Sequence, residues 1–350
     1  MKELQVTSQD AKQRLDKYLK RTFPEMGTSF LYKMLRKKNI TLNGKKATGS
    51  EQVVSGDLIQ CFFSDETFDK FAGISKSTPE DNQAKNDGFH TGKAVSYQAL
   101  CLEYKKAYEE LKGIAVIYED EHVLLLDKPA GVLSQKAKPE DVSLNEWMIG
   151  YLLQKESITE DSLIRFKPSV CNRLDRNTSG LVICGKTLIG SREMSRILKD
   201  RSLQKYYRTY VHGKMEGAET LIAYHTKDKK NNQAEICFTL SESTKKAYDE
   251  IVTAYRCMET KETYSYLEIE LITGKTHQIR AHLSAYGHPI VGDSKYGGMK
   301  NERNYPKHQL LHAYRIVFPN LDGDLTYLSN KEFVCEEPKV FMQFKINYFK

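Results

Sequence analysis

The chain has 350 residues, of which 40% are hydrophobic and 28% charged, and its formal net charge is +7. This length is enough for about two domains, and the composition is that of a globular protein rather than a disordered one. No apolar run approaches the roughly 20 residues that span a bilayer, and the seven cysteines include no Cys-x-x-Cys pair, which argues against a membrane protein, a disulfide framework and a zinc ribbon.

The positive charge is concentrated at the N-terminus. Residues 1–64 contain 12 Lys and Arg against 6 Asp and Glu. A basic segment on a nearly balanced body suggests an anionic polymer as partner, although a solvated lysine-rich surface explains the charge equally well. Residues 1–5 lack the apolar core of a signal peptide, so we expect a cytoplasmic protein with reduced thiols.

The first 64 residues predict a small α/β domain. One helix follows Arg14 and ends at Pro24, and a second begins near Thr28. Asn43-Gly44 then predicts a tight hairpin. Cations at the end of the second helix and in the hairpin are positioned to meet phosphates. They are Arg36, Lys37, Lys38, Lys45 and Lys46.

Residues 65–112 differ in character from the segments on either side. Asp65 to Gly92 is rich in polar residues without a sustained period, which indicates a loop or linker. Apolar side chains then recur at helical spacing from Tyr97, so a helix is expected up to Gly113. We assign no chemistry to this insertion.

The remaining residues, 113–350, alternate between helices and strands and then become rich in strands. Two strands flank an acidic turn within 114–127, and helices are expected around Trp147 and over 188–200. A short buried strand follows Gly180, an alternating strand covers 204–213, and the clearest strand covers 264–272.

The segment 171–180 carries one acid, Asp175, between two arginines in a run of turn-forming residues. Nearby cations favour the ionised form of a carboxylate, which makes Asp175 a candidate nucleophile. The alternative is a structural acid that caps a turn and pairs with Arg173 or Arg176. Local chemistry alone favours this second interpretation, because structural ion pairs are common.

Three histidines at 277, 282 and 288 raise the question of a metal site. Their spacing is not His-Glu-x-x-His and no carboxylate stands at a ligand offset, so hydrogen-bonded structural histidines are the better explanation. Gly-x-Gly-x-x-Gly and Gly-x-Ser-x-Gly are missing from the sequence. We therefore expect neither a metal nor a cofactor.

Residues 172–180, Asn-Arg-Leu-Asp-Arg-Asn-Thr-Ser-Gly, resemble the signature of the RluA-type pseudouridine synthases. Further blocks of that family appear in the family's order along the chain. Any one of them alone would be weak support. They are 119–131 with its Lys-Pro-Ala-Gly, 205–213 with its paired tyrosines, 273–283, and 287–293. One residue departs from the pattern, because Asn172 stands where the family usually has His.

The N-terminal segment also resembles a known module. Residues 14–16, 38–45 and 56–57 are similar to the small RNA-binding module named after a ribosomal small-subunit protein. A generic small α/β cap is the alternative. The expected organisation is thus an RNA-binding domain over 1–64, a linker or insertion over 65–112, and a catalytic domain over 113–350.

The resemblance implies isomerisation of uridine to pseudouridine within RNA by an α+β domain built around a twisted, mostly antiparallel mixed sheet. Asp175 occupies the position of the nucleophile and Arg280 the position of the cation that pairs with it. Tyr207 occupies the family's tyrosine position, where its ring stacks on the base or its hydroxyl serves proton transfer. Without the resemblance, Tyr207 would be a core aromatic residue of a strand.

The resemblance also implies that a uridine is flipped out of stacked RNA, which costs a few kcal/mol. We expect phosphate contacts from Arg173, Arg176, Lys275 and His277 together with the five N-terminal cations. The two loop arginines brace the loop in the alternative interpretation.

Large-subunit ribosomal RNA is the leading substrate and transfer RNA the second, with no membrane partner and a monomeric chain. A non-catalytic RNA-binding or ribosome-assembly protein is the rival function. A glycoside or nucleoside hydrolase fits less well, because most such enzymes pair two carboxylates and Asp175 has no acidic companion in its block.

Overall fold

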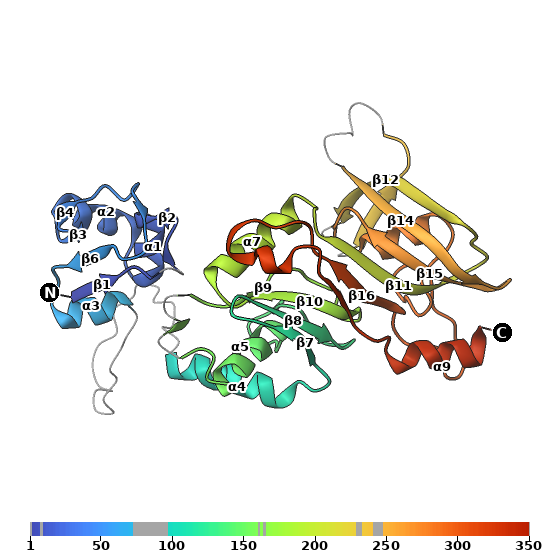
Figure 1. The fold of residues 1–350 in the computed structure, drawn as a ribbon. Coiled ribbons are helices and arrows are strands. Elements are labelled where there is room, and N and C mark those ends of the chain that lie inside the picture. The colour runs from blue at the N-terminus through green and yellow to red at the C-terminus, as the bar shows by residue number, and fades with distance from the viewer. Residues whose placement is uncertain are drawn as a thin grey trace. The chain divides into compact units, whose positions relative to one another are not determined.

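The computed structural model describes residues 2–7, 10–72, 97–159, 162–163, 166–228, 233–240 and 248–349. The chain forms two compact units (Figure 1). The first contains Met1–Glu110, Glu146–Pro168 and Thr187–Ile189, and the second contains Leu111–Asn145, Ser169–Lys186 and Gly190–Lys350.

The N-terminal part of the first unit is a small antiparallel sheet with two helices. The strand order is β1-β6-β3-β4, and β2 pairs separately with β5. Leu15, Leu19, Leu31 and Leu35 from the helices are fully buried in one core with Ile59 of β6. The elements are β1 (Lys2–Gln5), β2 (Gln13–Arg14), α1 (Leu15–Thr22), α2 (Thr28–Arg36), β3 (Ile40–Leu42), β4 (Lys45–Lys46), β5 (Gln52–Val53) and β6 (Leu58–Cys61).

The predicted hairpin is confirmed by its backbone. Asn43 and Gly44 have φ values of 49° and 72°, as a two-residue turn of the type I′ class requires. The Asn43 side chain secures the turn, because its Oδ1 accepts a hydrogen bond from the Leu58 amide at 2.7 Å. Lys45 and Lys46 follow the turn on an exposed strand.

Two details of this region differ from the sequence prediction. Asp65–Ala72 forms the helix α3 rather than loop, because Phe68 and Ala72 are buried in the N-terminal core. Thr28 is the first residue of helix α2 and does not cap it. Gly27 occupies the capping position, so the helix has no side-chain cap. Residues 73–96 of the expected linker lie outside the described residues.

The expected helix after the linker is confirmed as α4 (Tyr97–Glu110). It pairs with α5 (Leu144–Gln154), where Gly150 allows close approach: a Cβ there would lie 2.1 Å from the Tyr104 carbonyl oxygen. The rings of Trp147 and Tyr151 stack at 5.4 Å, and both contact Tyr108.

The second unit is organised around one large twisted sheet, seen in Figure 1 running from β7 to β12. The strand order is β13-β12-β14-β15-β11-β16-β10-β8-β7, with β17 beside β16 and β9 beside β10. All pairs are antiparallel except β10 with β16. This confirms the predicted mixed, mostly antiparallel sheet.

The strands are β7 (Ala115–Glu119), β8 (Val123–Lys128), β9 (Ser169–Val170), β10 (Ser179–Gly185), β11 (Gln204–His212), β12 (Ala218–Asp228), β13 (Gln233–Cys237), β14 (Asp249–Thr260), β15 (Tyr264–Leu271), β16 (Leu311–Val317) and β17 (Glu332–Val334). The helices are α7 (Leu188–Lys199), α8 (Gln278–Ala285), the 3₁₀ helix η3 (Gly323–Leu328) and α9 (Lys339–Tyr348).

Two hydrophobic clusters support interior strands of this sheet. Met194 and Ile197 of α7 pack on Leu181 and Ile183 of β10, as the helical spacing predicted. Phe341 and Phe344 of α9 pack on Tyr210 of β11. The strands that carry the candidate site are therefore covered by helices and firmly packed.

The register around the parallel pair brings distant segments together. Ser179 pairs with His312, which in turn pairs with Arg208, so β10, β16 and β11 are aligned in one row. Gly180 makes this approach possible, because its φ is +114° and a Cβ would lie 2.3 Å from the Ala313 carbonyl oxygen. The pairing shifts between Tyr206 and Arg208, and such irregularities re-aim side chains next to active sites.

Candidate active site

The loop between β9 and β10 carries Asp175 and is held by side chains on both sides. Asn172 accepts a hydrogen bond from the Ile183 amide at 2.7 Å and donates to the Leu181 carbonyl at 3.4 Å. Ser134 Oγ accepts from the Leu174 amide and donates to the Leu174 carbonyl, at 3.0 and 2.9 Å. The chain just before the acid is therefore tied to β10 and to the segment after β8.

Lys128 is a fully buried cation beneath the same loop. Its Nζ donates to the carbonyl oxygens of Pro129, Val132 and Arg176 at 3.0, 2.8 and 3.1 Å. Burial lowers the pKa of Lys128 to about 7, while the negative charges of Asp175 and Asp127 act in the opposite direction. This lysine joins the turn after β8 to the segment just beyond Asp175.

The carboxylate of Asp175 pairs with an arginine on helix α8. Arg280 Nη1 lies 2.7 Å from Asp175 Oδ2. The other side of the guanidinium is held by Asp293, with Nε at 2.7 Å and Nη2 at 2.9 Å from its two oxygens. Asp293 is completely buried, and the paired carboxylates raise the pKa of Arg280 above its usual value despite burial. The guanidinium is thus a fixed positive charge beside Asp175.

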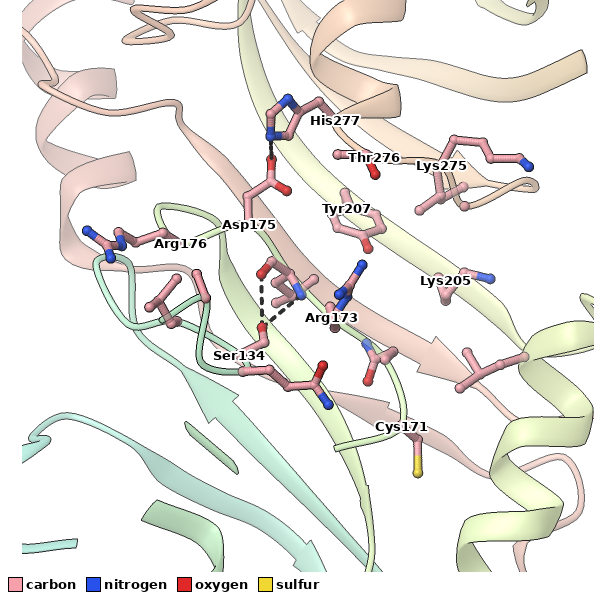
Figure 2. Close-up of a pocket in the computed structure, with 18 of the residues that line it drawn as sticks. Ser134, Cys171, Arg173, Asp175, Arg176, Lys205, Tyr207, Lys275, Thr276 and His277 are labelled. Atoms are coloured by element: carbon pink, nitrogen blue, oxygen red, sulfur yellow. Dashed lines mark hydrogen bonds and ion pairs between the residues drawn. The ribbon is translucent and has the colours of Figure 1, made fainter. Parts of the chain in front are cut away.

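Tyr207 stands on β11 beside Asp175, as Figure 2 shows. It is 6% exposed, and it lines the same cavities as Asp175. Burial raises the pKa of its hydroxyl, and the neighbouring Asp175 charge adds to the shift. The phenol is therefore neutral and keeps its proton for donation or stacking.

His277 contacts the same carboxylate from the turn before α8. Its Nε2 lies 3.8 Å from Asp175 Oδ2, and its Nδ1 lies 3.0 Å from the Tyr296 hydroxyl (Figure 2 shows the first contact). Burial lowers the pKa of His277. The residue has a φ of +54°, an uncommon conformation for a non-glycine residue that is found at functional sites.

A cavity of about 680 Å³ opens in front of Asp175. Among the described residues, Asp175 is the only carboxylate of its wall, and the other charged side chains there are six cations. Such a wall favours an anionic ligand with a phosphodiester backbone. The six are Lys136, Arg173, Arg176, Arg201, Lys205 and Lys275.

The two arginines of the loop are not the partners of Asp175. Arg173 and Arg176 are exposed, and among the described residues neither side chain makes an ion pair or hydrogen bond. The local interpretation of Asp175 as a turn acid paired with them is therefore wrong. Lys275 is paired with Asp249 at 2.7 Å, at the rim of the same cavity.

The structure brings together all seven predicted site residues of the second unit: Asp175, Tyr207, Arg280, Arg173, Arg176, Lys275 and His277. The five N-terminal cations belong to the other unit, where all of them are exposed.

Several residues of the site were missed from sequence. Lys128 and Asp293 stand in the Lys-Pro-Ala-Gly and Gly-Asp motifs, which were noticed without a role being assigned. Arg201, Lys205 and Tyr296 were likewise given no role. The fold brings Arg201 and Lys205 to the wall of the cavity and Tyr296 to His277.

Comparison with known proteins agrees with this geometry. Residues 122–285 match the family described as RNA pseudouridylate synthase. The ribosomal large subunit pseudouridine synthase C of Rickettsia felis is 30% identical over 330 residues, which cover 92% of this chain and 96% of that protein. The chain belongs to the RNA pseudouridine synthase family. The sequence-based assignment to the RluA-type enzymes is confirmed.

Two further relatives of this pseudouridine synthase extend the comparison. An uncharacterised RNA pseudouridine synthase of Mycoplasma genitalium is 29% identical over 322 residues, covering 91% of this chain and 89% of that protein. The structure of human RNA pseudouridylate synthase domain containing 4 has a TM-score of 0.52 at 18% identity and covers 71% of this chain and 97% of that chain. This likeness supports the predicted fold.

Among the described residues of the synthase, no helix combines the length and apolar character needed to cross a membrane. The cytoplasmic location, the monomeric state and the RNA-binding role of the N-terminal module stay predictions.

Proposed function

We propose that the protein isomerises uridine to pseudouridine within an RNA chain, with Asp175 as the nucleophile and no cofactor. The observation that carries the proposal is the pair of Asp175 and Arg280 at 2.7 Å, facing a cavity with a cationic wall. An ionised carboxylate held by a fixed cation is suited to attack at a sugar carbon. Membership of the family supplies the reaction type.

The reaction breaks the bond between N1 of uracil and C1′ of ribose and forms a bond between C5 and C1′. The Asp175 carboxylate acts at the ribose, either by attack on C1′ or by removal of the C2′ proton, and N1 leaves with the bonding electrons. After the base has turned, C5 bonds to C1′ as the bond from Asp175 to C1′ breaks or, on the other route, as the proton returns to C2′. C5 then loses its proton, while N1 gains one. Atoms and charge balance without an outside reactant.

Tyr207 and Arg280 have distinct roles in this scheme. Arg280 pairs with the Asp175 carboxylate and orients it. Tyr207, which stays neutral because burial raises the pKa of its hydroxyl, stacks on the uracil or transfers the proton at C5 or C2′.

We infer that the substrate uridine lies in a structured RNA and is flipped into the cavity at a cost of a few kcal/mol. Phosphate contacts by Arg173 and Arg176 offset that cost, because both are exposed and have no protein partner among the described residues. The N-terminal module adds further contacts through its exposed cations.

Large-subunit ribosomal RNA is the proposed target, since the Rickettsia felis relative carries that name. Transfer RNA is the alternative. A carbodiimide-based map of pseudouridine in RNA from cells lacking the protein tests both. We expect one or more sites in large-subunit RNA to disappear and to return with the wild-type protein. A site lost from transfer RNA alone would make transfer RNA the target. A map in which no site is lost would contradict the proposed pseudouridine synthase activity.

A further inference from the structure

The hydroxyl of Tyr296 has one possible hydrogen-bond acceptor among the described residues. The Ala234 amide donates to this oxygen at 2.8 Å, and His277 Nδ1 lies 3.0 Å away. Among the described residues no other group forms a hydrogen bond with the hydroxyl. Burial raises the pKa of Tyr296, so the phenol keeps its proton. That proton is satisfied only if His277 Nδ1 accepts it.

The opposite arrangement is unfavourable at both ends of the imidazole. With the proton on Nδ1, the phenol O–H would lack an acceptor among the described residues, which is unfavourable for a half-buried donor. The unprotonated Nε2 would then direct its lone pair at Asp175 Oδ2, 3.8 Å away. With the proton on Nε2, both contacts are favourable. Burial also lowers the pKa of His277, which keeps the ring neutral.

The donors around Asp175 converge on one oxygen. Arg280 Nη1 lies 2.7 Å and His277 Nε2 3.8 Å from Oδ2. In the part of the chain that the structure describes, no hydrogen bond or ion pair reaches Oδ1. The carboxyl side chain retains 26% exposure, and it lines the cavity. Oδ1 is therefore the oxygen that is available for reaction.

Tyr296 also contacts the second partner of Asp175. The Arg280 guanidinium lies 5.1 Å from the centre of the Tyr296 ring, a distance at which a cation is attracted to the ring face. The Tyr296 amide donates to Asp293 Oδ1 at 3.2 Å, and Asp293 in turn holds Arg280. One residue therefore touches both groups that hold Oδ2.

We propose that Tyr296 is a positioning residue that fixes His277 as the Nε2–H tautomer, so that His277 and Arg280 together hold Oδ2 of Asp175 and leave Oδ1 to react. The proposal rests on the proposed function for the role of Oδ1, although the tautomer of His277 is a property of the protein alone. Tyr296 and His277 act through Asp175 and do not themselves form or break bonds.

The tautomer is measurable in the intact protein by nitrogen NMR of ¹⁵N-histidine-labelled protein, because protonated and bare ring nitrogens resonate far apart. The His277 signals are assigned by their loss in His277→Gln. We expect bare Nδ1 and protonated Nε2 in the wild type, and a mixture of tautomers in Tyr296→Phe. A wild-type ring protonated at Nδ1, or a Tyr296→Phe spectrum identical to the wild type, would overturn the proposal.

Two substitutions at 277 test the role of the donor in turnover. The amide of Gln reaches the place of Nε2, whereas the shorter amide of Asn does not, and Asn tolerates the left-handed backbone of this position well. We expect single-turnover rates with His277→Asn to fall several-fold below His277→Gln, because the contact of 3.8 Å is weaker than a full hydrogen bond. RNA affinity should be equal in both. Equal rates would show that the N–H donor is irrelevant.

The two claims fail in different ways. Wild-type protein that makes no pseudouridine in any RNA would overturn the proposed function, whatever the spectra show. The wrong tautomer in an active enzyme would overturn only the positioning role of Tyr296.

Discussion

Arg280 Nη1 lies 2.7 Å from Oδ2 of Asp175, although the two residues are 105 positions apart in the chain. The same guanidinium is clamped by Asp293, whose side chain is completely buried. Arg280 therefore has two functions: it neutralises a buried carboxylate, and it orients the carboxylate that reacts. Changes at this position should affect stability and turnover together.

Replacing Arg280 with Met should lower the free energy of unfolding by roughly 3–5 kcal/mol, because it leaves Asp293 buried without a cation. Urea unfolding measures this loss. The control is Arg196→Met on α7, an exposed arginine paired with Glu193, for which we expect a change within about 0.5 kcal/mol. Equal effects of the two substitutions would contradict the role of Arg280 in stability.

Arg280→Lys keeps the charge but cannot make the bidentate contact with Asp293 and reach Asp175 as well. We expect turnover to fall by about 10²- to 10³-fold, as for the loss of a fixed electrostatic donor. Single-turnover formation of pseudouridine at saturating enzyme is the measurement. A lysine variant with wild-type turnover would mean that charge alone is enough.

The buried Lys128 should make the free energy of unfolding depend on pH. Burial lowers the pKa of its ammonium from the ordinary value of 10.5 to about 7. The unfolded chain therefore binds more protons at this residue between these two values, so its contribution to stability rises as the pH rises from 7 toward 10.5. Urea unfolding of wild type and Lys128→Met across that range isolates the effect. The difference in stability should grow in favour of the wild type, and a difference independent of pH would contradict the prediction.

Asn172 bears on the one departure from the family pattern. Its amide bonds to the backbone at Ile183 and Leu181, so Asn172→Ala should lose about 1 kcal/mol of stability. Asn172→His restores the usual family residue and should keep pseudouridine formation within a few-fold. Thermal unfolding and turnover measure the two effects. Loss of RNA affinity with unchanged stability in Asn172→Ala would instead place the residue at the RNA.

Arg173 and Arg176 should each contribute to the salt dependence of RNA binding. For single-stranded RNA, each lost phosphate contact reduces the slope of log K against log salt by about 0.7. We expect this reduction for Arg173→Met and Arg176→Met, measured by fluorescence anisotropy at several salt concentrations. Lys345→Met is the control, because Lys345 pairs with Glu259 and does not line the cavity. Slopes equal to that of the wild type would show that the two arginines do not contact RNA phosphates.

The secondary structure and the main site residues were predictable because their signals are local or belong to ordered motifs. Hydrophobic periodicity located α1, α7, β11 and β15. The Asn43-Gly44 pair indicated its hairpin, and the blocks around Asp175, Tyr207 and Arg280 indicated the family.

Local chemistry did not predict the partners inside the site, because the fold decides which distant residues meet. It favoured Arg173 or Arg176 as the partner of Asp175, whereas the family resemblance named Arg280, and the structure pairs Asp175 with Arg280. The buried hydrogen bonds of Lys128 and the contact between His277 and Tyr296 likewise join residues whose meeting no pattern of spacing records. Helix α3 was missed because its polar residues hide the few apolar positions that pack.

The most direct test of the account is pseudouridine formation by Asp175→Asn, which keeps the shape of the side chain but removes its charge. Turnover on purified large-subunit RNA should fall by on the order of 10⁴-fold or more, as for the loss of a catalytic nucleophile. RNA affinity should stay within a few-fold of the wild type, because the cations of the cavity remain. Formation of pseudouridine at the wild-type rate would contradict the assignment of Asp175 as the nucleophile.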